Sequence, residues 1–219
     1  MTIQERLFAL RDETYAAFSA KLIPTVEPDR FIGVRSPQLR SIAKGLKNSA
    51  SEFLSALPHR YHEENMLHAY LLCVGSDYAI VVEQTERFLP FVDNWAVCDS
   101  LAPRAFARHK AELMPRIEKW MSAEHEYTVR FGIGTLMRHY LDADFRPEYL
   151  RRVAEIHRNE YYIKMMQAWY FATALAKQWD ATLPMLDTLE PWVCAKSIQK
   201  AIESFRVSPD HKDLLRTLR

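Results

Sequence analysis

The sequence predicts an all-α protein whose helices form an α-solenoid. Only five of the 219 residues are glycine, whereas average usage would give about fifteen. Scarce glycine disfavours sheets with tight hairpins and glycine-rich phosphate loops, and the eleven prolines mark turns between helices. A hydrophobic content of 48% is enough for a substantial core, so we expect one domain over residues 1–219.

Helix starts can be predicted in order along the chain. Residues 2–22 have apolar side chains at steps of three to five, which predicts one amphipathic helix that the following prolines stop. Ser36 is the expected N-cap of a second helix, with Pro37 at its first position and an end near Asn48. Further helices are expected to start near Ser51, Glu63, Tyr78, Asn94, Lys110, Glu126, Pro147, Glu160, Leu183 and Pro191.

One internal repeat is a more specific signal than the hydropathy pattern, because residue types recur in register. The run from Glu126 to Arg130 recurs from Glu160 to Lys164, at an offset of 34 residues, and weaker echoes lie on either side of it. Periods in the thirties with two helices per unit are typical of HEAT and tetratricopeptide solenoids. About six such pairs would fit the chain. The alternative is an irregular helical bundle whose helices resemble one another only in composition.

A solenoid would give the recurring residues a common position. The second helix of each pair lines the concave groove, so Arg130, Lys164 and Lys196 would form a basic row there, with Trp95 and Trp169 close by. Basic residues interleaved with aromatic ones suit a polyanion that carries flat or sugar surfaces. The net charge of +1 gives no such signal, so a basic surface must come from segregation of charge onto one face.

The segment 91–100, FVDNWAVCDS, is the strongest candidate for chemistry. Trp95 and Asp99 stand four residues apart, which puts a carboxylate one helical turn beyond an indole. If Asn94 or Asp93 caps this helix, Asp99 lies past the first turn, where capping does not explain it. From spacing alone, a core Trp95 and a solvated or ion-paired Asp99 are the favoured interpretation.

Two residues of the repeated helices each allow two interpretations. Arg130 opens an otherwise apolar helix and is either an ion-pair partner or a phosphate contact. Trp169 lies on a helix over residues 160–176 that is apolar on several sides. It either belongs to the core or faces the groove.

Several other chemistries lack their signatures. Because G-x-G-x-x-G, P-loop and G-x-S-x-G motifs are missing from the sequence, no nucleotide cofactor is expected. His59 and His62 are three residues apart, but no H-E-x-x-H or Cys-His cluster accompanies them, so no metal site is predicted and surface histidines are expected. Cys98 has no partner base near it in sequence and is expected to be a structural thiol.

The cellular setting is predicted from what the chain lacks. Three cysteines without metal-ligand spacing, no leader sequence and no long apolar run predict a reduced, cytoplasmic protein that does not enter a membrane. We expect it to act as a monomer.

Five segments, in their order and spacing, resemble the DNA alkylation repair enzymes, a family of alkylpurine DNA glycosylases built from HEAT-like repeats. They are FIGVRSPQLRSIAKGL, DNWAVCDS, EYTVRFGIGTLMRHYL, YYIKMMQAWYFATALAK and KSIQKAIESFRVS. The resemblance implies that duplex DNA with alkylated purines lies along the concave face. It also implies that Trp95 and Trp169 lie against the deoxyribose of the damaged nucleotide, with Asp99 near the sugar and Arg130 on a phosphate.

The chemistry that the resemblance implies is hydrolysis of the N-glycosidic bond without base flipping. An N3- or N7-alkylated purine is cationic and leaves as a neutral base, so the developing positive charge lies on the sugar. A carboxylate stabilises an oxocarbenium-like sugar and orients the attacking water, and indole faces favour the same charge. Glycosylases that flip the base into a deep pocket work differently.

Two functions of other classes remain open from the sequence. One is a non-catalytic protein that recognises bent or branched DNA through its basic row. The other is a protein-interaction scaffold. Release of free base would distinguish an enzyme from the first, and DNA affinity at low salt would distinguish both DNA-binding functions from the second.

Overall fold

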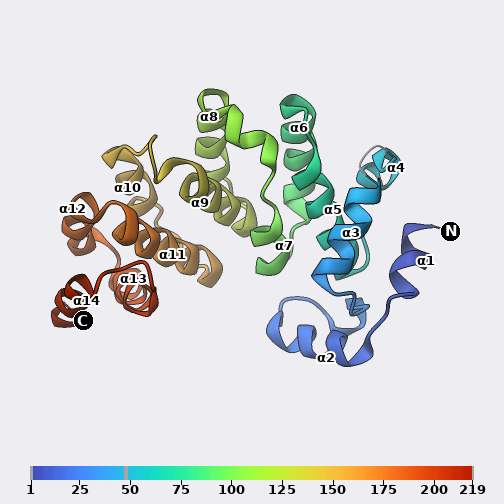
Figure 1. The fold of residues 1–219 in the computed structure, drawn as a ribbon, viewed down its shortest axis with the longest axis horizontal. Coiled ribbons are helices and arrows are strands. Elements are labelled where there is room, and N and C mark those ends of the chain that lie inside the picture. Colours follow the sequence, from blue (N-terminus) through green and yellow to red (C-terminus); the bar gives the residue numbers. More distant parts are fainter. Residues whose placement is uncertain (1, 47–48, 219) are drawn as a thin grey trace. The chain divides into compact units, whose positions relative to one another are not determined.

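The computed structural model describes residues 2–46 and 49–218, and this part of the chain is helical, with no strand. Within these described ranges, fourteen α-helices and four short 3-10 segments succeed one another (Figure 1). The predicted all-α class is therefore confirmed. The chain divides into two compact units, Met1–Lys110 (unit 1) and Ala111–Arg219 (unit 2), which are described separately. A single HEAT-like repeat domain over 1–219 stays a prediction.

Unit 1 is built around one buried helix. Every residue of α5 from His62 to Leu72 is buried, and α5 packs against both α3 and α7. The elements in order are α1 (Ile3–Phe8), α2 (Glu13–Leu22), η1 (Pro28–Arg30), α3 (Ser36–Leu46), α4 (Ser51–Ser55), α5 (His62–Val74), α6 (Tyr78–Phe88), η2 (Leu89–Phe91), α7 (Trp95–Ser100) and η3 (Arg104–Arg108).

Residues 2–22 form two helices, so the prediction of one continuous helix is wrong. The Asp12 side chain accepts a hydrogen bond from the Tyr15 N–H at 2.9 Å and starts α2 there. An N-cap of this kind satisfies a backbone donor that would otherwise lack a partner, so it favours a helix start even where apolar spacing continues. Ser36 is the first residue of α3 rather than its cap. The expected end near Asn48 falls outside the described residues.

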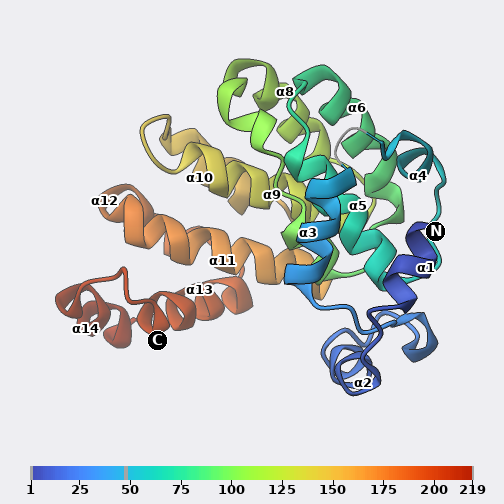
Figure 2. The ribbon, with the colours of Figure 1, turned by 45° about the vertical axis from the view of Figure 1, so that its right-hand side comes forward.

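Unit 2 has a layer of three long helices. Helix α11 packs between α9 and α13, and Figures 1 and 2 show these three side by side. Helix α10 packs on α11 and on η4, and α14 packs on α13. The elements are α8 (Lys110–Met121), α9 (Glu126–Tyr140), α10 (Pro147–Ala154), α11 (Tyr161–Lys177), α12 (Trp179–Thr182), η4 (Leu183–Thr188), α13 (Pro191–Glu203) and α14 (Pro209–Thr217).

Most of the predicted helix starts are confirmed. Proline occupies the first position of α10 and of α13, where its missing N–H costs nothing. Predicted starts at Glu63 and Glu160 lie one residue from the observed ones. Leu183 begins a 3-10 segment instead of an α-helix.

The link between α2 and α3 is fixed by a buried carboxylate. Glu63 is 2% exposed, and its two oxygens accept hydrogen bonds from the backbone N–H groups of Ile32 (2.9 Å) and Gly33 (2.7 Å). Burial raises the pKa of Glu63, and the backbone N–H bonds oppose that rise. Gly33 has φ +93°, and a Cβ at this residue would lie 2.0 Å from the Asp12 carbonyl oxygen. Glycine is therefore required where the link passes α2.

Candidate functional site

A cavity of about 440 Å³ lies in unit 1 and has both Trp95 and Asp99 in its wall. Helix α7 carries the two residues, and the Asn94 side chain starts this helix by accepting the Val97 N–H at 3.0 Å. Trp95 and Asp99 therefore share one face of a helix, as their spacing predicts. The rest of the wall comes mainly from α2, α3 and α5, including Tyr15, Phe18, Leu39, Arg40, His62 and Met66.

Trp95 is held against helix α2 while part of its indole lines the cavity. Its Nε1–H donates to the Leu22 carbonyl oxygen at 3.3 Å. The half-buried indole packs on the cluster formed by Ile23, Val26 and Phe31. Trp95 is thus partly a core residue and partly a residue of the cavity wall.

Asp99 is half-buried in the same wall. Glu63 and His62 of α5 line the cavity as well, and both are more deeply buried than Asp99. The Asn94 Nδ2 lies 3.4 Å from His62 Nδ1, and burial lowers the pKa of His62 to about 4. His62 is therefore neutral at pH 7, and the more accessible carboxyl group of the cavity is that of Asp99, beside the Trp95 indole.

The expectation of surface positions for His59 and His62 is wrong, because both are buried, at 8% and 7% exposure. His59 Nε2 lies 2.8 Å from His68 Nδ1, so one ring donates a hydrogen bond and the other accepts it. His68 also stacks on Phe88 with ring centroids 4.0 Å apart. Spacing alone cannot show this burial, since it depends on helices that pack around α5 from both sides.

The apolar wall that helix α2 supplies could not be found from motifs. Phe18 and Leu22 are 55% and 51% exposed although both line the cavity. Arg40 of α3 adds a cation to the same wall, with its guanidinium carbon 5.0 Å from the centre of the Tyr70 ring. The apolar spacing of residues 2–22 signals a helix, but not which part of the fold that helix covers.

In unit 2, acidic and basic residues of the internal repeat form hydrogen bonds and an ion pair between consecutive long helices. Arg130 on α9 is 4% exposed, and its Nη1–H donates to the Tyr162 carbonyl oxygen at 2.8 Å. Glu126, also on α9, accepts from the Tyr162 N–H at 3.1 Å. One repeat later, Lys164 on α11 pairs with Glu190, the N-cap of α13, at 3.4 Å. The basic residues thus hold the first turn of the next helix in the layer.

The other predicted groove residues of unit 2 are more accessible. Lys196 donates to the Gln199 side-chain oxygen at 3.0 Å and lies 6.0 Å from the Trp192 ring centre. Trp169 is 41% exposed and lines a separate hollow of about 380 Å³. Trp169 is therefore not a core residue, and that it faces a DNA-binding groove stays a prediction. That Arg130, Lys164 and Lys196 contact DNA stays a prediction.

A comparison with models of known protein families matches residues 3–169 to the family described as DNA alkylation repair enzyme. The matched segment is well over half of the sequence and contains the α7 residues as well as Arg130 and Trp169. The chain belongs to the DNA alkylation repair enzyme family. This confirms the resemblance carried by the motifs, and it indicates an enzyme with a role in DNA repair. A comparison with curated proteins gave no match.

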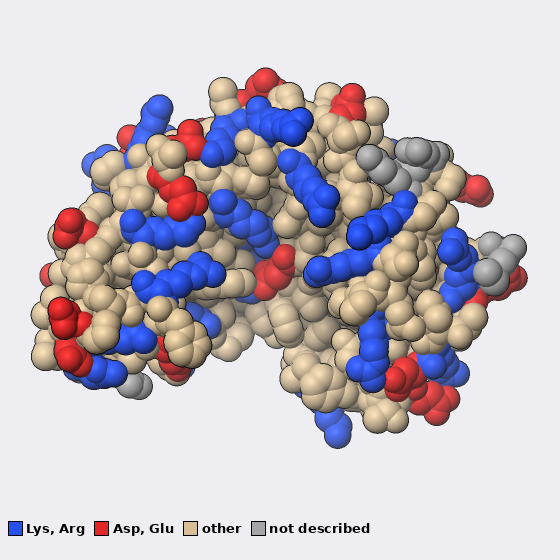
Figure 3. All heavy atoms as spheres, viewed as in Figure 1, with Lys and Arg blue, Asp and Glu red and all other residues tan. Residues whose placement is uncertain are grey.

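For a member of the DNA alkylation repair enzyme family, the placement of charge is informative. Figure 3 shows basic side chains spread over one face of each unit with acidic side chains among them, as 29 basic and 28 acidic residues imply. A locally positive surface therefore depends on cations that have no acidic partner. Within residues 2–46 and 49–218, no three His, Cys, Asp or Glu side chains are grouped to hold a metal ion. No helix in these ranges is long and apolar enough to cross a bilayer.

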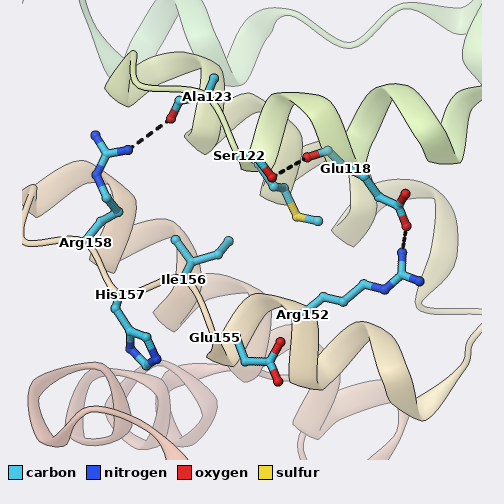
Figure 4. A pocket seen from close by; sticks show the side chains of 9 residues that line it. Glu118, Ser122, Ala123, Arg152, Glu155, Ile156, His157 and Arg158 are labelled. Atoms are coloured by element: carbon cyan, nitrogen blue, oxygen red, sulfur yellow. Dashed lines mark hydrogen bonds and ion pairs between the residues drawn. The ribbon is translucent and has the colours of Figure 1, made fainter.

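Figure 4 shows a hollow of about 490 Å³ in which the basic side chains are already bonded to other groups of the protein. Arg152 pairs with Glu118 across it. Arg158 donates to the carbonyl oxygens of Ala123 (3.0 Å) and Glu124 (2.7 Å) and to the Glu160 carboxylate. The bond to Glu160 raises the pKa of Arg158 and lowers that of Glu160. Both guanidinium groups of this hollow are thus held by protein acceptors.

Proposed function

We propose that this protein is a monofunctional DNA N-glycosylase that removes cationic N3- and N7-alkylated purines from duplex DNA without base flipping. One observation carries the proposal: Trp95 and Asp99, one helical turn apart, line the same cavity in a chain of the DNA alkylation repair enzyme family. The proposed substrate is a purine that alkylation has already made a good leaving group.

In this mechanism Asp99 acts on the sugar and not on the base. As the glycosidic bond breaks, positive charge develops on the deoxyribose, and a nearby carboxylate stabilises it and orients the attacking water. The faces of Trp95 and Trp169 favour the same charge through their quadrupoles. Because the alkylated base leaves neutral, the reaction needs no strong general acid, and we propose that it uses neither a metal nor a nucleotide cofactor.

We further propose that the helices form one α-solenoid of about six HEAT-like pairs with DNA along its concave groove. The packing of α11 between α9 and α13, and the recurring ties between them, support this proposal. Lys196 would reach a phosphate directly, and Lys164 would do so by exchanging its Glu190 partner for the phosphate. Arg130 would add the charge of a guanidinium held just beneath the surface. We propose a cytoplasmic monomer.

A non-catalytic DNA-binding protein is the second candidate, and one contact favours it. Helix α2 covers part of Trp95, because the indole N–H is bonded to the Leu22 carbonyl and the ring packs on the apolar cluster beside it. A ring held in this way offers less surface to a nucleotide than an uncovered indole would. Such a protein would bind bent or branched DNA and release no base.

The deciding experiment follows both binding and base release on the same duplex, which carries N7-methylguanine or N3-methyladenine. We expect the wild-type protein to bind the duplex and release free methylated base. Asp99→Asn should bind the duplex as the wild-type protein does. Its rate of base release should be at least roughly 100-fold lower, since the substitution removes the charge that stabilises the transition state. Binding without release by the wild-type protein would overturn the glycosylase proposal and select the second candidate.

A further inference from the structure

The hollow that contains Trp169 brings together two exposed aromatic side chains of unit 2. Trp169 on α11 is 41% exposed, and Phe205, in the turn between α13 and α14, is 102% exposed. The hollow has a volume of about 380 Å³. Its wall is completed by Ala172, Thr173, Ala176, Lys200, Glu203, Ser204 and Arg206. These residues all lie within unit 2, on two neighbouring helices and the turn that follows.

Among residues 2–46 and 49–218, Phe205 is not buried by any neighbour, since its side chain is fully exposed. The turn around it is fixed by its neighbours, because Val207 is 4% exposed and the Ser204 hydroxyl oxygen accepts the Arg206 N–H at 3.2 Å. A single exposed apolar residue is ordinary on a protein surface. Here the exposed ring shares a hollow with an exposed indole, and cations flank both.

The cations of this hollow differ from those of the repeat. Within residues 2–46 and 49–218, neither the Lys200 ammonium nor the Arg206 guanidinium forms an ion pair or a side-chain hydrogen bond. Arg130 and Lys164, by contrast, are held by acceptors on the next helix. The single acid of the hollow, Glu203, accepts a hydrogen bond from Gln199 Nε2 at 2.9 Å. The hollow therefore has a positive balance and cations able to bind an anion.

We infer that this hollow is a DNA contact in which Phe205 stacks on or wedges beside a base, while Lys200 and Arg206 hold the adjacent phosphates. The inference rests on the proposed function, because it assumes that the protein binds DNA. Aromatic faces next to unpaired cations match the alternation of bases and phosphates along a strand. Apolar side chains inserted beside a base step are a known means of bending a duplex. DNA offers both groups together, since phosphates satisfy the cations and flat bases pack on the rings.

The test measures the affinity and salt dependence of binding to a fluorescent duplex with a tetrahydrofuran abasic site, which cannot be turned over. Phe205→Ala should weaken binding roughly 5- to 100-fold, the range for loss of one base–aromatic stack, without changing the salt slope. Lys200→Gln combined with Arg206→Gln should weaken binding and reduce the slope of log K against log salt by about 0.9 per lost phosphate contact.

Two control variants remove similar groups elsewhere. Ile80→Ala deletes an exposed apolar side chain of α6, and Arg151→Gln removes an exposed cation of α10. Both should bind as the wild-type protein does. If the wild-type protein binds and Phe205→Ala binds equally well, the inference is wrong and the proposed function stands. If the wild-type protein binds no DNA at low salt, the proposed function fails and the inference fails with it.

Discussion

Gly33 is the residue on which the position of α2 depends. Its φ is +93°, and the Asp12 carbonyl oxygen lies 2.0 Å from the point that a Cβ would occupy, so only hydrogen fits there. We expect Gly33→Ala to lower the free energy of unfolding by more than about 1–3 kcal/mol, because backbone strain and a clash act together. Urea denaturation followed by circular dichroism measures this.

Gly45 provides the matched control for Gly33. It lies in helix α3, and a Cβ there would meet nothing within 4 Å. Gly45→Ala should leave stability unchanged or raise it by up to about 1 kcal/mol, since alanine costs less entropy in a helix. Equal losses in the two variants would contradict the close approach at Gly33.

The buried histidines make stability depend on pH. Burial lowers the pKa from 6.5 to about 4 for His59 and His62 and to about 3 for His68, so all three are neutral in the folded protein at pH 7. Well above pH 6.5 these histidines are neutral in both states and do not make stability depend on pH. As the pH falls from 6.5 toward 4, only the unfolded chain takes up protons. The folded state should then lose up to about 1.4 kcal/mol per pH unit for each histidine.

His68→Asn tests this pH dependence, because its amide can replace the bonded Nδ1 without titrating. The unfolding free energy is measured at pH 6.5, 5.5 and 4.5. It should fall less steeply with decreasing pH in this variant than in the wild-type protein, because the unfolded variant takes up roughly one proton fewer. The exposed His157 serves as control, and His157→Asn should keep the wild-type slope. The same slope in all three proteins would show that His68 is not held neutral.

The polar contacts that connect α9, α11 and α13 differ in strength. Arg130 is buried and bonded to a backbone carbonyl, whereas Lys164 pairs with a Glu190 side chain that is 44% exposed. We expect Arg130→Ala to cost about 2–3 kcal/mol of unfolding free energy, because the part-buried Tyr162 carbonyl loses a charged donor and the buried arginine side chain is removed. Lys164→Ala should cost under about 1 kcal/mol. Thermal and urea unfolding of both variants measures the difference.

A larger loss for Lys164→Ala than for Arg130→Ala would contradict these assignments. The comparison also bears on DNA binding, since a destabilised Arg130 variant can lose affinity without losing a phosphate contact. Affinities of Arg130→Ala should therefore be measured only under conditions where the variant is folded.

The elements themselves were largely predictable because their signals are local. Proline at the first helical position marked α10 and α13, and Asn94 marked the start of α7. The break before α2 was also signalled locally, by Asp12, but the continuing apolar spacing concealed it. The partners of Arg130 could not be predicted, because its acceptor is a backbone carbonyl 32 residues further along the chain.

For the whole molecule, the motifs predicted the family and part of the site. Trp95 and Asp99 could be predicted to share a face because helical spacing alone determines it. Glu63, Arg40 and the α2 wall required knowledge of which helices pack together, which no local pattern contains. Burial of His59 and His62 was missed for the same reason. Family membership then added the DNA repair role, which neither charge nor composition indicated.

The central claim is that Asp99 stabilises a cationic deoxyribose, and single-turnover release of N7-methylguanine from duplex DNA tests it most directly. The wild-type protein should release the base faster than spontaneous depurination, and Asp99→Asn should be slower by roughly 100-fold or more. Asp180→Asn, an exposed acid of α12, should match the wild-type rate. Equal rates for Asp99→Asn and the wild-type protein, or wild-type release no faster than the spontaneous reaction, would contradict the claim.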